Sequence, residues 1–505
     1  MDLIRRISRR SLAFTLALVA VSITMTTDIS LAQQEQPPAP SAPRPAQFPK
    51  PVEKSLKNGL RVVVVERPGS SLVSAQVLIK QGGEVDPPQL AGLADMTATL
   101  LTKGTEKRNA PEIAEAIEAL GGQLESGARW DASSASVTIM SSRIEPAMGI
   151  LADVVRRPTF KEEEIERLRQ QTQDELSVAM SQPGTVARYV ASRVVFGDAP
   201  YGHPLAGTLE SIERIKRDDI VRLHSTYYRP DNAILVIGGD IKAEEAFNLA
   251  ERVFGDWAKP STPAPAPSVE TAKEMTADSK PRVVVVDMEH AGQAAVVLAR
   301  PGLKRTDPEY FRGLVTNSVL GGGYSARLNQ EIRIKRGLSY GASSALDVRR
   351  GIGPFLAATQ TKNESGAIVA SLLIDELGRL SSDAVADTEL TPRKAALMGN
   401  FARNLEATQG LVAQVGSLAL YGLSLDEINN YLNNVQAITA SDVQKFAGAR
   451  LATSGANIII VGNAKMFIDD LRKRFPNVEV IPEKELDLNN ATLRKSKAGG
   501  GTPQG

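Results

Sequence analysis

The chain of 505 residues contains no cysteine and only three histidines, His203, His224 and His290. The lack of cysteine excludes disulfides, thiolate metal sites and cysteine nucleophiles. No two histidines are near one another in the sequence, which constrains any zinc site, and each is expected to be structural rather than a ligand. Lys and Arg number 59 and Asp and Glu 58, so the charge balance indicates neither nucleic acid nor an anionic membrane surface as a partner.

Long apolar runs are also scarce, and the longest lies near the N-terminus. Arginines between Arg5 and Arg10 precede an apolar run of 13 residues, Ala13–Met25, which is too short to span a bilayer comfortably. The tripeptide SLA at Ser30–Ala32 is a plausible cleavage site, so residues 1–32 are predicted to be a signal peptide for export to the periplasm of a Gram-negative envelope. An uncleaved anchor is the alternative, and the stretch SRRSLAF does not decide between the general and the twin-arginine export routes. No stable membrane span is expected after cleavage.

Composition divides the remaining chain into segments. Residues 33–50 are rich in Pro, Ala and Gln and are predicted to be a spacer, and residues 259–281 are predicted to be a surface linker for the same reason. Residues 51–258 and 282–484 are then two globular domains, named here the first and second repeats. Residues 485–505 are predicted to be a disordered tail.

Local patterns predict strands and helices mixed along the chain. The Asn58-Gly59 turn before a run of valines is typical of a hairpin, and Ala233–Asp240 (AILVIGGD) indicates a buried strand. Helices are predicted over Pro111–Leu120, Arg143–Val155 and Lys161–Met180. Hairpins interspersed with helices favour an α+β fold over a doubly wound parallel sheet.

The two repeats share sequence. RVVVVDM opens the second as RVVVVER opens the first. Ile215–Leu223 (IKRDDIVRL) corresponds to Ile438–Phe446 (ITASDVQKF) at an offset of 223 residues, and AILVIGGD corresponds to NIIIVGNA at an offset of 224. A nearly constant offset predicts one duplicated unit of about 220 residues. Chance similarity of two strand-helix ends is the alternative.

Four stretches in a fixed order resemble the pitrilysin/insulinase/mitochondrial-processing-peptidase family of zinc peptidases. They are Gly92–Thr105 (GLADMTATLLTKGT), Ala119–Asp131, Tyr201–Ile241 and Gly321–Ser344. The resemblance extends over about residues 51–484. It implies two homologous domains that form a half-shell, each a mostly antiparallel sheet with helices packed on one face.

The zinc motif of that family is degenerate here. Active members carry HxxEH, whose histidines lie one helical turn apart and bind one zinc ion while the glutamate acts as general base. The resemblance puts Asp95 and Thr99 at the histidine positions, Ala98 at the glutamate position, Glu175 at the third ligand and Leu168 at an accessory glutamate. A catalytic zinc needs about three protein ligands, so no metal is expected in this chain. A weak hard-cation site at Asp95 and Glu175 is disfavoured, and Glu175 is interpreted as a solvated helix residue.

A second motif is retained. The family carries an arginine and a tyrosine seven residues apart that face the zinc across a cleft and contact the scissile peptide, and Arg333 and Tyr340 match them. A guanidinium and a phenol can both donate hydrogen bonds to a developing oxyanion. A surface arginine and a packed tyrosine are the structural alternative. The run Gly321–Gly323 either permits close backbone approach or simply makes a turn.

This combination implies the non-zinc subunit of a heterodimeric periplasmic zinc metalloendopeptidase. Its partner would be an HxxEH-bearing homologue that holds the zinc, in a heterodimer or a dimer of heterodimers, with peptide as substrate. Substrate in this family adds as a strand to an edge of the zinc subunit, and Glu125, Ser126 and Ala128 depart from the usual residues there. The alternative is a stand-alone pseudo-peptidase that binds peptides or envelope partners. A stand-alone hydrolase is disfavoured because no clustered catalytic motif is present.

Overall fold

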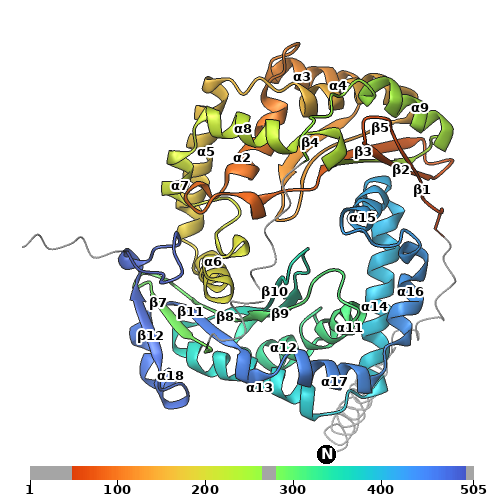
Figure 1. Ribbon diagram of the computed structural model, residues 1–505. Helices are drawn as coiled ribbons and strands as arrows, with labels where there is room; N and C mark the ends of the chain where they lie inside the picture. The colour runs from red at the N-terminus through yellow and green to blue at the C-terminus, as the bar shows by residue number, and fades with distance from the viewer. Residues whose placement is uncertain (1–47, 264–279, 496–505) are drawn as a thin grey trace, which may run out of the picture. The chain divides into compact units, whose positions relative to one another are not determined.

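The computed structural model describes residues 48–263 and 280–495 (Figure 1). The predicted signal peptide, most of the spacer, residues 264–279 of the linker and the last ten residues lie outside this range. Each repeat contains one six-stranded sheet with helices between its strands, so the predicted α+β class is confirmed.

The first sheet has the strand order β1-β2-β6-β3-β5-β4, and only the β2–β6 pair is parallel. The second sheet has the order β12-β7-β11-β8-β10-β9, with β7 parallel to both β12 and β11. The strands are β1 (Val52–Ser55), β2 (Arg61–Glu66), β3 (Leu72–Ile79), β4 (Gln123–Ala128), β5 (Ser133–Met140), β6 (Ala233–Gly239), β7 (Val283–Asp287), β8 (Ala294–Pro301), β9 (Ser339–Leu346), β10 (Pro354–Thr361), β11 (Asn457–Gly462) and β12 (Val478–Pro482).

Helices separate these strands in both repeats. Those of the first repeat are α2 (Leu93–Leu100), α3 (Ala110–Ala119), α4 (Ile144–Arg156), α5 (Glu162–Met180), α6 (Pro183–Phe196), α7 (Leu209–Arg214), α8 (Arg217–Tyr227) and α9 (Ala243–Phe254). Those of the second are α11 (Tyr310–Leu320), α12 (Arg327–Asn329), α13 (Gly366–Ser382), α14 (Asp387–Glu406), α15 (Thr408–Leu420), α16 (Glu427–Ala437), α17 (Ala440–Arg450) and α18 (Ile468–Arg474). The helices predicted within residues 111–180 correspond to α3, α4 and α5.

The internal duplication is confirmed by the strand order. Strands β2, β6, β3, β5 and β4 occupy the same places in the first sheet as β7, β11, β8, β10 and β9 in the second. The sixth strand differs, because β1 precedes its repeat and β12 follows its own. The pairing of β1 with β2 through the Asn58-Gly59 turn also confirms the predicted hairpin.

The central strands are buried on both faces, which explains their unbroken valine and isoleucine runs. In β2, Val62 and Val64 pack with the helices of the first repeat. Val63 and Val65 face the other way and pack with a cluster built mainly from the second repeat. A sheet of this kind needs cover on its second face as well as its first.

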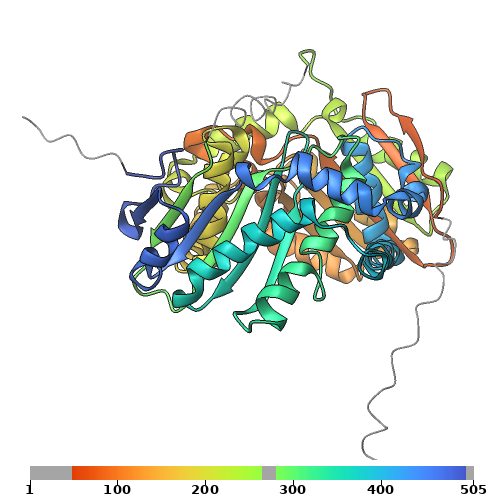
Figure 2. The same cartoon turned by 90° about the horizontal axis from the view of Figure 1, so that it is seen from below.

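That second cover is a helix exchanged between the repeats. Helix α15, from the second repeat, packs on β3 and β6 of the first sheet, while α6, from the first repeat, packs on β8 and β11 of the second (Figures 1 and 2). The two helices occupy equivalent places in the two repeats, since their first residues, Pro183 and Thr408, are separated by nearly the same offset as the matching stretches of sequence. The sequence predicted helices on one face only and did not predict the exchange.

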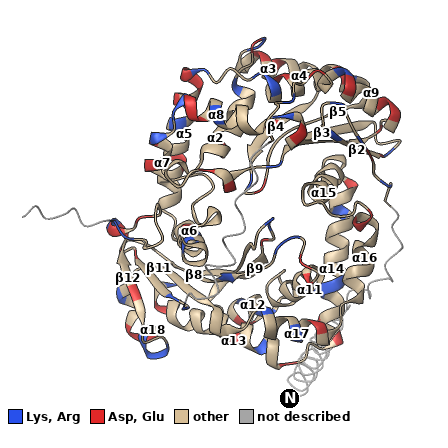
Figure 3. Ribbon diagram, in the orientation of Figure 1, with Lys and Arg blue, Asp and Glu red and all other residues tan. Residues whose placement is uncertain are grey.

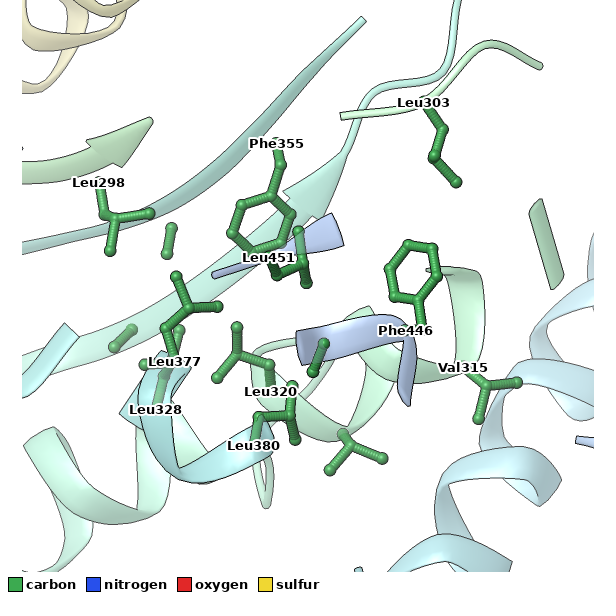
Figure 4. Close-up of a cluster of buried hydrophobic side chains, with 14 of the residues drawn as sticks. Leu298, Leu303, Val315, Leu320, Leu328, Phe355, Leu377, Leu380, Phe446 and Leu451 are labelled. Carbon is green, nitrogen blue, oxygen red and sulfur yellow. The ribbon is translucent and has the colours of Figure 1, made fainter. Parts of the chain in front are cut away.

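The helix-covered face of the second sheet shows how each repeat builds its core (Figure 4). Leu298 of β8 and Phe355 of β10 meet Leu377 and Leu380 of α13 and Phe446 of α17, all fully buried or nearly so. The apolar side chains of the strands and helices are removed from water here, and this removal is the main favourable contribution to folding.

A loop of the second repeat docks into the first. Between β9 and β10, Arg350 donates from Nη1 to Glu84 Oε1 at 2.8 Å, and from Nη2 to the Lys80 and Asp131 carbonyl oxygens at 2.5 and 3.0 Å. Its backbone N–H donates to Asp131 Oδ2 at 2.7 Å. Arg350 therefore ties together the ends of β3 and the β4–β5 loop.

Asp131 is the acceptor at the centre of this contact. The hydroxyl of Tyr201 donates to Oδ1 at 2.5 Å, and that of Tyr421, just after α15, donates to Oδ2 at 3.0 Å. Beside them, the Arg349 guanidinium stacks over the rings of Trp130 and Tyr201 at 4.5 and 4.7 Å from their centroids. Both repeats thus contribute to one buried polar cluster.

The prediction of a disordered tail is wrong for residues 485–495. Leu486, Leu488 and Leu493 are buried against the α6 side of the second sheet. Arg193 of α6 donates to the Leu488 carbonyl oxygen at 2.7 Å. Residues 485–495 are therefore ordered, because three apolar side chains among polar neighbours find a place on this face.

No helix within residues 48–263 or 280–495 has both the length and the apolar character needed to cross a bilayer. Figure 3 shows basic and acidic residues interspersed along the helices of both repeats.

The close approach of α15 to the first sheet depends on Gly416. A Cβ at this position would lie 2.9 Å from Leu78 Cδ1 and 3.1 Å from Gln76 Oε1. We expect Gly416→Val to lower the free energy of unfolding by about 1–3 kcal/mol through overpacking, measured by denaturant titration. The control is Gly448→Ala on α17, where a Cβ meets only ordinary contacts and should stabilise by about 0.5–1 kcal/mol. A Gly416 variant of unchanged stability would contradict the described packing.

The buried Glu84 carboxyl should make stability depend on pH. Burial raises its pKa from the ordinary 4.5 to about 8, although the Arg350 charge opposes the shift. The folded state then binds the extra proton, so this contribution to stability is full below pH 4.5 and is lost as the pH rises through about 8. We expect Glu84→Gln to flatten the fall in unfolding free energy between pH 5 and pH 8.5, measured by denaturant titration. Parallel profiles for the two proteins would contradict this.

Candidate functional site

The degenerate zinc-motif positions lie on α2, close to β4 and α5. Ala98 is fully buried, whereas Asp95 and Thr99 are half-buried on the same helical face, as their spacing of four residues requires. Leu168, on α5, packs against the first-repeat core. Glu175, further along α5, is exposed and accepts a hydrogen bond from Gln171 Nε2 at 2.9 Å.

Electrostatics show that Asp95 and Glu175 are neighbours. The pKa of Asp95 is raised by burial and, to a smaller extent, by the negative charge of Glu175, while a hydrogen bond from the Ala128 backbone opposes the shift. By the resemblance, this face of α2 corresponds to the one that carries HxxEH, and α2 is in contact with α5, the helix that carries Glu175.

The three histidines lie elsewhere. His203 is buried between the Pro204 and Gly83 carbonyl oxygens, 2.9 Å from Nδ1 and 3.1 Å from Nε2. His224 donates to the Val155 carbonyl oxygen at 2.9 Å and stacks on Tyr228, and burial lowers its pKa to about 4. His290 is exposed in the turn after β7.

Zinc does not fit the residues present. Among the described residues, no three His, Cys, Asp or Glu side chains gather in a way that could hold a metal ion. At the motif itself, Asp95 and Glu175 supply carboxylates only, and the hydroxyl of Thr99 is a poor substitute for imidazole.

Arg333 stands on a π-helical turn, Gln330–Ile334, which continues from α12. Single π turns of this kind occur frequently at functional sites. The turn closes through Gly337, whose φ of +64° suits glycine and whose N–H donates to the Arg333 carbonyl oxygen at 2.9 Å. The Arg333 side chain is half-buried and lies over the ring of Tyr324, with Cζ 4.9 Å from the centroid.

Tyr340 is 88% exposed at the start of β9, the edge strand of the second sheet. It is not a packed core tyrosine. Its hydroxyl is therefore accessible to a group from outside the described chain. Tyr324 is also exposed, at 64%. Sequence reasoning did not single out Tyr324, although a tyrosine directly after three glycines was a usable signal.

A cavity of about 290 Å³ adjoins Tyr340, between the first turn of α6 and the second sheet. Arg188 of α6 and Gln360 of β10 line it together with Tyr340 and Ser343. The sequence analysis did not predict Arg188 or Gln360 at a site, because the exchange of α6 brings Arg188 to the edge of the second sheet beside Gln360, and local patterns do not show this exchange.

The first sheet has the equivalent cavity, of about 300 Å³, beside the first turn of α15. Its lining includes Glu125, Ser126 and Ala128 of the edge strand β4, the residues that depart from the family pattern. Gln409 of α15 reaches Glu125 with Nε2 3.5 Å from Oε2. The two repeats therefore place an open cavity at the same edge of each sheet.

The Gly321–Gly323 run allows the backbone after α11 to lie directly against β9 and against the last turn of α11. A Cβ at Gly321 would lie 2.2 Å from the backbone nitrogen of Ser344 on β9, and one at Gly322 would lie 2.6 Å from Ser318 Cα. The end of α11 can thus contact β9 directly, and the Ser344 N–H donates to the Gly321 carbonyl oxygen at 3.2 Å. This contact fixes the edge strand that carries Tyr340.

Fold and motif together define a two-domain, peptidase-like α+β protein. Residues 61–209 match the sequence profile described as "Insulinase (Peptidase family M16)", and residues 214–397 match "Peptidase M16 inactive domain". The chain therefore belongs to peptidase family M16, the insulinase family.

Similar proteins agree with this assignment. An uncharacterised zinc protease of Streptomyces coelicolor is 26% identical over 393 residues, which cover 78% of this chain and 85% of the relative. The crystal structure of a peptidase M16 inactive domain from Pseudomonas fluorescens is 26% identical with a TM-score of 0.75, covering 82% of this chain and 98% of that one. A protease from Helicobacter pylori has a TM-score of 0.76 at 21% identity, covers 82% and 100%, and shows the fold alone.

The retained geometry of α2 and α5 predicts that zinc binding can be restored. In Asp95→His/Thr99→His, two imidazoles and Glu175 supply three ligands, so we expect about one zinc ion per chain, measured by metal analysis after dialysis. Adding Glu175→Gln should remove most of that zinc, and the unaltered chain serves as the reference. A doubly substituted chain that folds but retains no zinc would show that α2 does not face α5 as described.

Proposed function

We propose that this chain is the non-zinc subunit of a heterodimeric zinc metalloendopeptidase in the periplasm. The observation that carries the proposal is the contrast between the two repeats. The first keeps the motif geometry with none of the family's imidazoles or its base, whereas the second keeps Arg333 and presents Tyr340 at 88% exposure. No packing within the described chain explains that exposed ring.

The role of this chain is then to complete a site that its partner begins. The partner carries HxxEH and holds the zinc. Arg333 and Tyr340 donate hydrogen bonds to the peptide carbonyl oxygen as it gains negative charge, which is the kind of contact that stabilises a transition state more than a substrate. The stack of Arg333 on Tyr324 limits the positions of the guanidinium before substrate arrives.

A stand-alone peptide-binding protein is the second candidate. The open cavities beside the edge strands β4 and β9 favour it, since an extended peptide can pair with a free strand edge. The two candidates differ in what accompanies the chain. Affinity purification from the native envelope with mass-spectrometric identification should recover a homologue with intact HxxEH in equal amount. Recovery of the chain alone, or with unrelated proteins, would contradict the subunit proposal and favour the stand-alone binder.

Within the purified complex, Arg333→Ala should lower kcat for peptide hydrolysis by about 10²–10³-fold without preventing assembly, because one oxyanion donor is lost. Activity is measured by peptide cleavage and assembly by size-exclusion chromatography. Arg336→Ala is the matched control, since Arg336 lies three residues away and pairs with Glu331. Unchanged turnover in an assembled Arg333→Ala complex would exclude the assigned role.

A further inference from the structure

A charged pocket lies in the second repeat, separate from the cavity beside Tyr340. It has a volume of about 460 Å³ and lies between residues 325–335, α13 and the first turns of α14. Its lining includes four basic side chains and three carboxylates, a composition unlike that of the two sheet-edge cavities.

Each of the three carboxylates already has a basic partner. Arg327 donates to both oxygens of Glu389 at 2.9 Å each. Lys335 donates to Glu331 at 2.8 Å, and Arg379 donates to Glu376 at 2.9 Å. Arg393 is the fourth base, and these pairs leave it without a carboxylate.

The Arg393 side chain is both buried and unpartnered. The residue is only 8% exposed, yet among residues 48–263 and 280–495 no acceptor lies within hydrogen-bond or ion-pair distance of its guanidinium. Burial lowers its pKa, and the Glu389 charge offsets this in part. Most of the residue is buried, but no nitrogen of its guanidinium is a buried atom without a partner, so the N–H donors are accessible from the pocket. An acceptor that enters the pocket from outside the described chain can therefore accept from them.

The fold does not require a charge at this position. Helices α14 and α15 follow α5 and α6 at the same offset, so Arg393 occupies the place of Leu168 in the first repeat. Leu168 is half-buried and packs against the first-repeat core. The first repeat therefore folds with an apolar side chain at this position.

We propose that the pocket at Arg393 binds a carboxylate ligand, held by paired hydrogen bonds from the guanidinium. The planar fork of arginine matches the two oxygens of a carboxylate. With three of the four bases paired to the three carboxylates, the pocket has one positive charge in excess, which a monovalent carboxylate neutralises. A dianion such as phosphate would leave an excess negative charge beside the three carboxylates. The volume admits more than a single small ion, so the carboxylate belongs to a larger group, either an acidic side chain or a chain terminus of a peptide.

Occupancy of this pocket reaches the turn that carries Arg333. Gln330 and Glu331 belong to the π-helical turn and also line the pocket. A ligand on Arg393 therefore contacts the turn from the side of α14. The proposal itself does not depend on a peptidase partner, and it can be tested on this chain alone.

The test is calorimetric titration of the purified chain, without its signal peptide, at constant ionic strength with chloride as the background anion. The probes are N-acetylglutamic acid α-amide, which has only a side-chain carboxylate, and N-acetylalanine, which has only a terminal one. N-acetylglutamine amide is the neutral reference, and inorganic phosphate is the dianion. We expect saturable binding of at least one carboxylate probe, with the side-chain or terminal probe identifying the source, and weaker binding of the reference and of phosphate.

Variants locate the site. Arg393→Met should weaken carboxylate binding by about 10–100-fold, as expected for the loss of a charge-assisted hydrogen-bonded pair. Arg403→Met, an exposed arginine on the same helix, is the matched control and should bind as the unaltered chain does. Thr388→Trp occludes the pocket at an exposed rim position and should also abolish binding, which decides the matter if the Arg393 variant does not fold. Absence of binding by both carboxylate probes, equal binding of phosphate, or unchanged affinity in folded Arg393→Met or Thr388→Trp would overturn the proposal.

Discussion

The reciprocal exchange of α6 and α15 is the interaction on which the rest of the structure depends. Each sheet has a second apolar face that its own repeat leaves uncovered, and each repeat covers that face of the other. The valine runs of β2 and β7 depend on this cover, because both faces of these strands are apolar. A strand buried on one face alone would have apolar and polar residues in alternation. The contact of Arg350 with Glu84 and Asp131 adds polar links between the same two repeats.

The exchange also determines where function can reside. With both faces of each sheet covered, the edge strands remain, which are β1 and β4 in the first sheet and β12 and β9 in the second. The two sheet-edge cavities lie beside β4 and β9, next to the first turns of the exchanged helices. The two edges differ in what lies beside them, because β4 is in contact with α2, which carries Asp95 and Thr99, whereas β9 presents Tyr340 and follows the turn with Arg333.

Much of this could be predicted from the sequence because the signals were local. The Asn58-Gly59 turn and the buried strand β6 follow from neighbouring residues, the duplication follows from similar stretches at a nearly constant offset, and the resemblance gave the motif positions. The exchange could not be predicted, because an amphipathic helix does not record which sheet it covers. The same reason hid Arg188, Gln360 and Arg393, whose surroundings come from distant elements. Residues 485–495 resembled a tail because three leucines among polar residues form no helical or strand periodicity. The sheet face against which they pack comes from distant parts of the chain.

The exchange of helices makes each repeat depend on a second copy for the burial of its sheet. A single repeat with its crossing helix would bury its sheet only by trading that helix with a second copy, which is a domain-swapped homodimer. Joining two such copies in one chain fixes their ratio at one to one and removes the dependence of pairing on concentration. The two copies can then diverge in sequence and remain paired, because they are covalently linked. Leu168 and Arg393 are equivalent positions that differ, as two halves joined in one chain can, because they do not have to be identical in order to fold together.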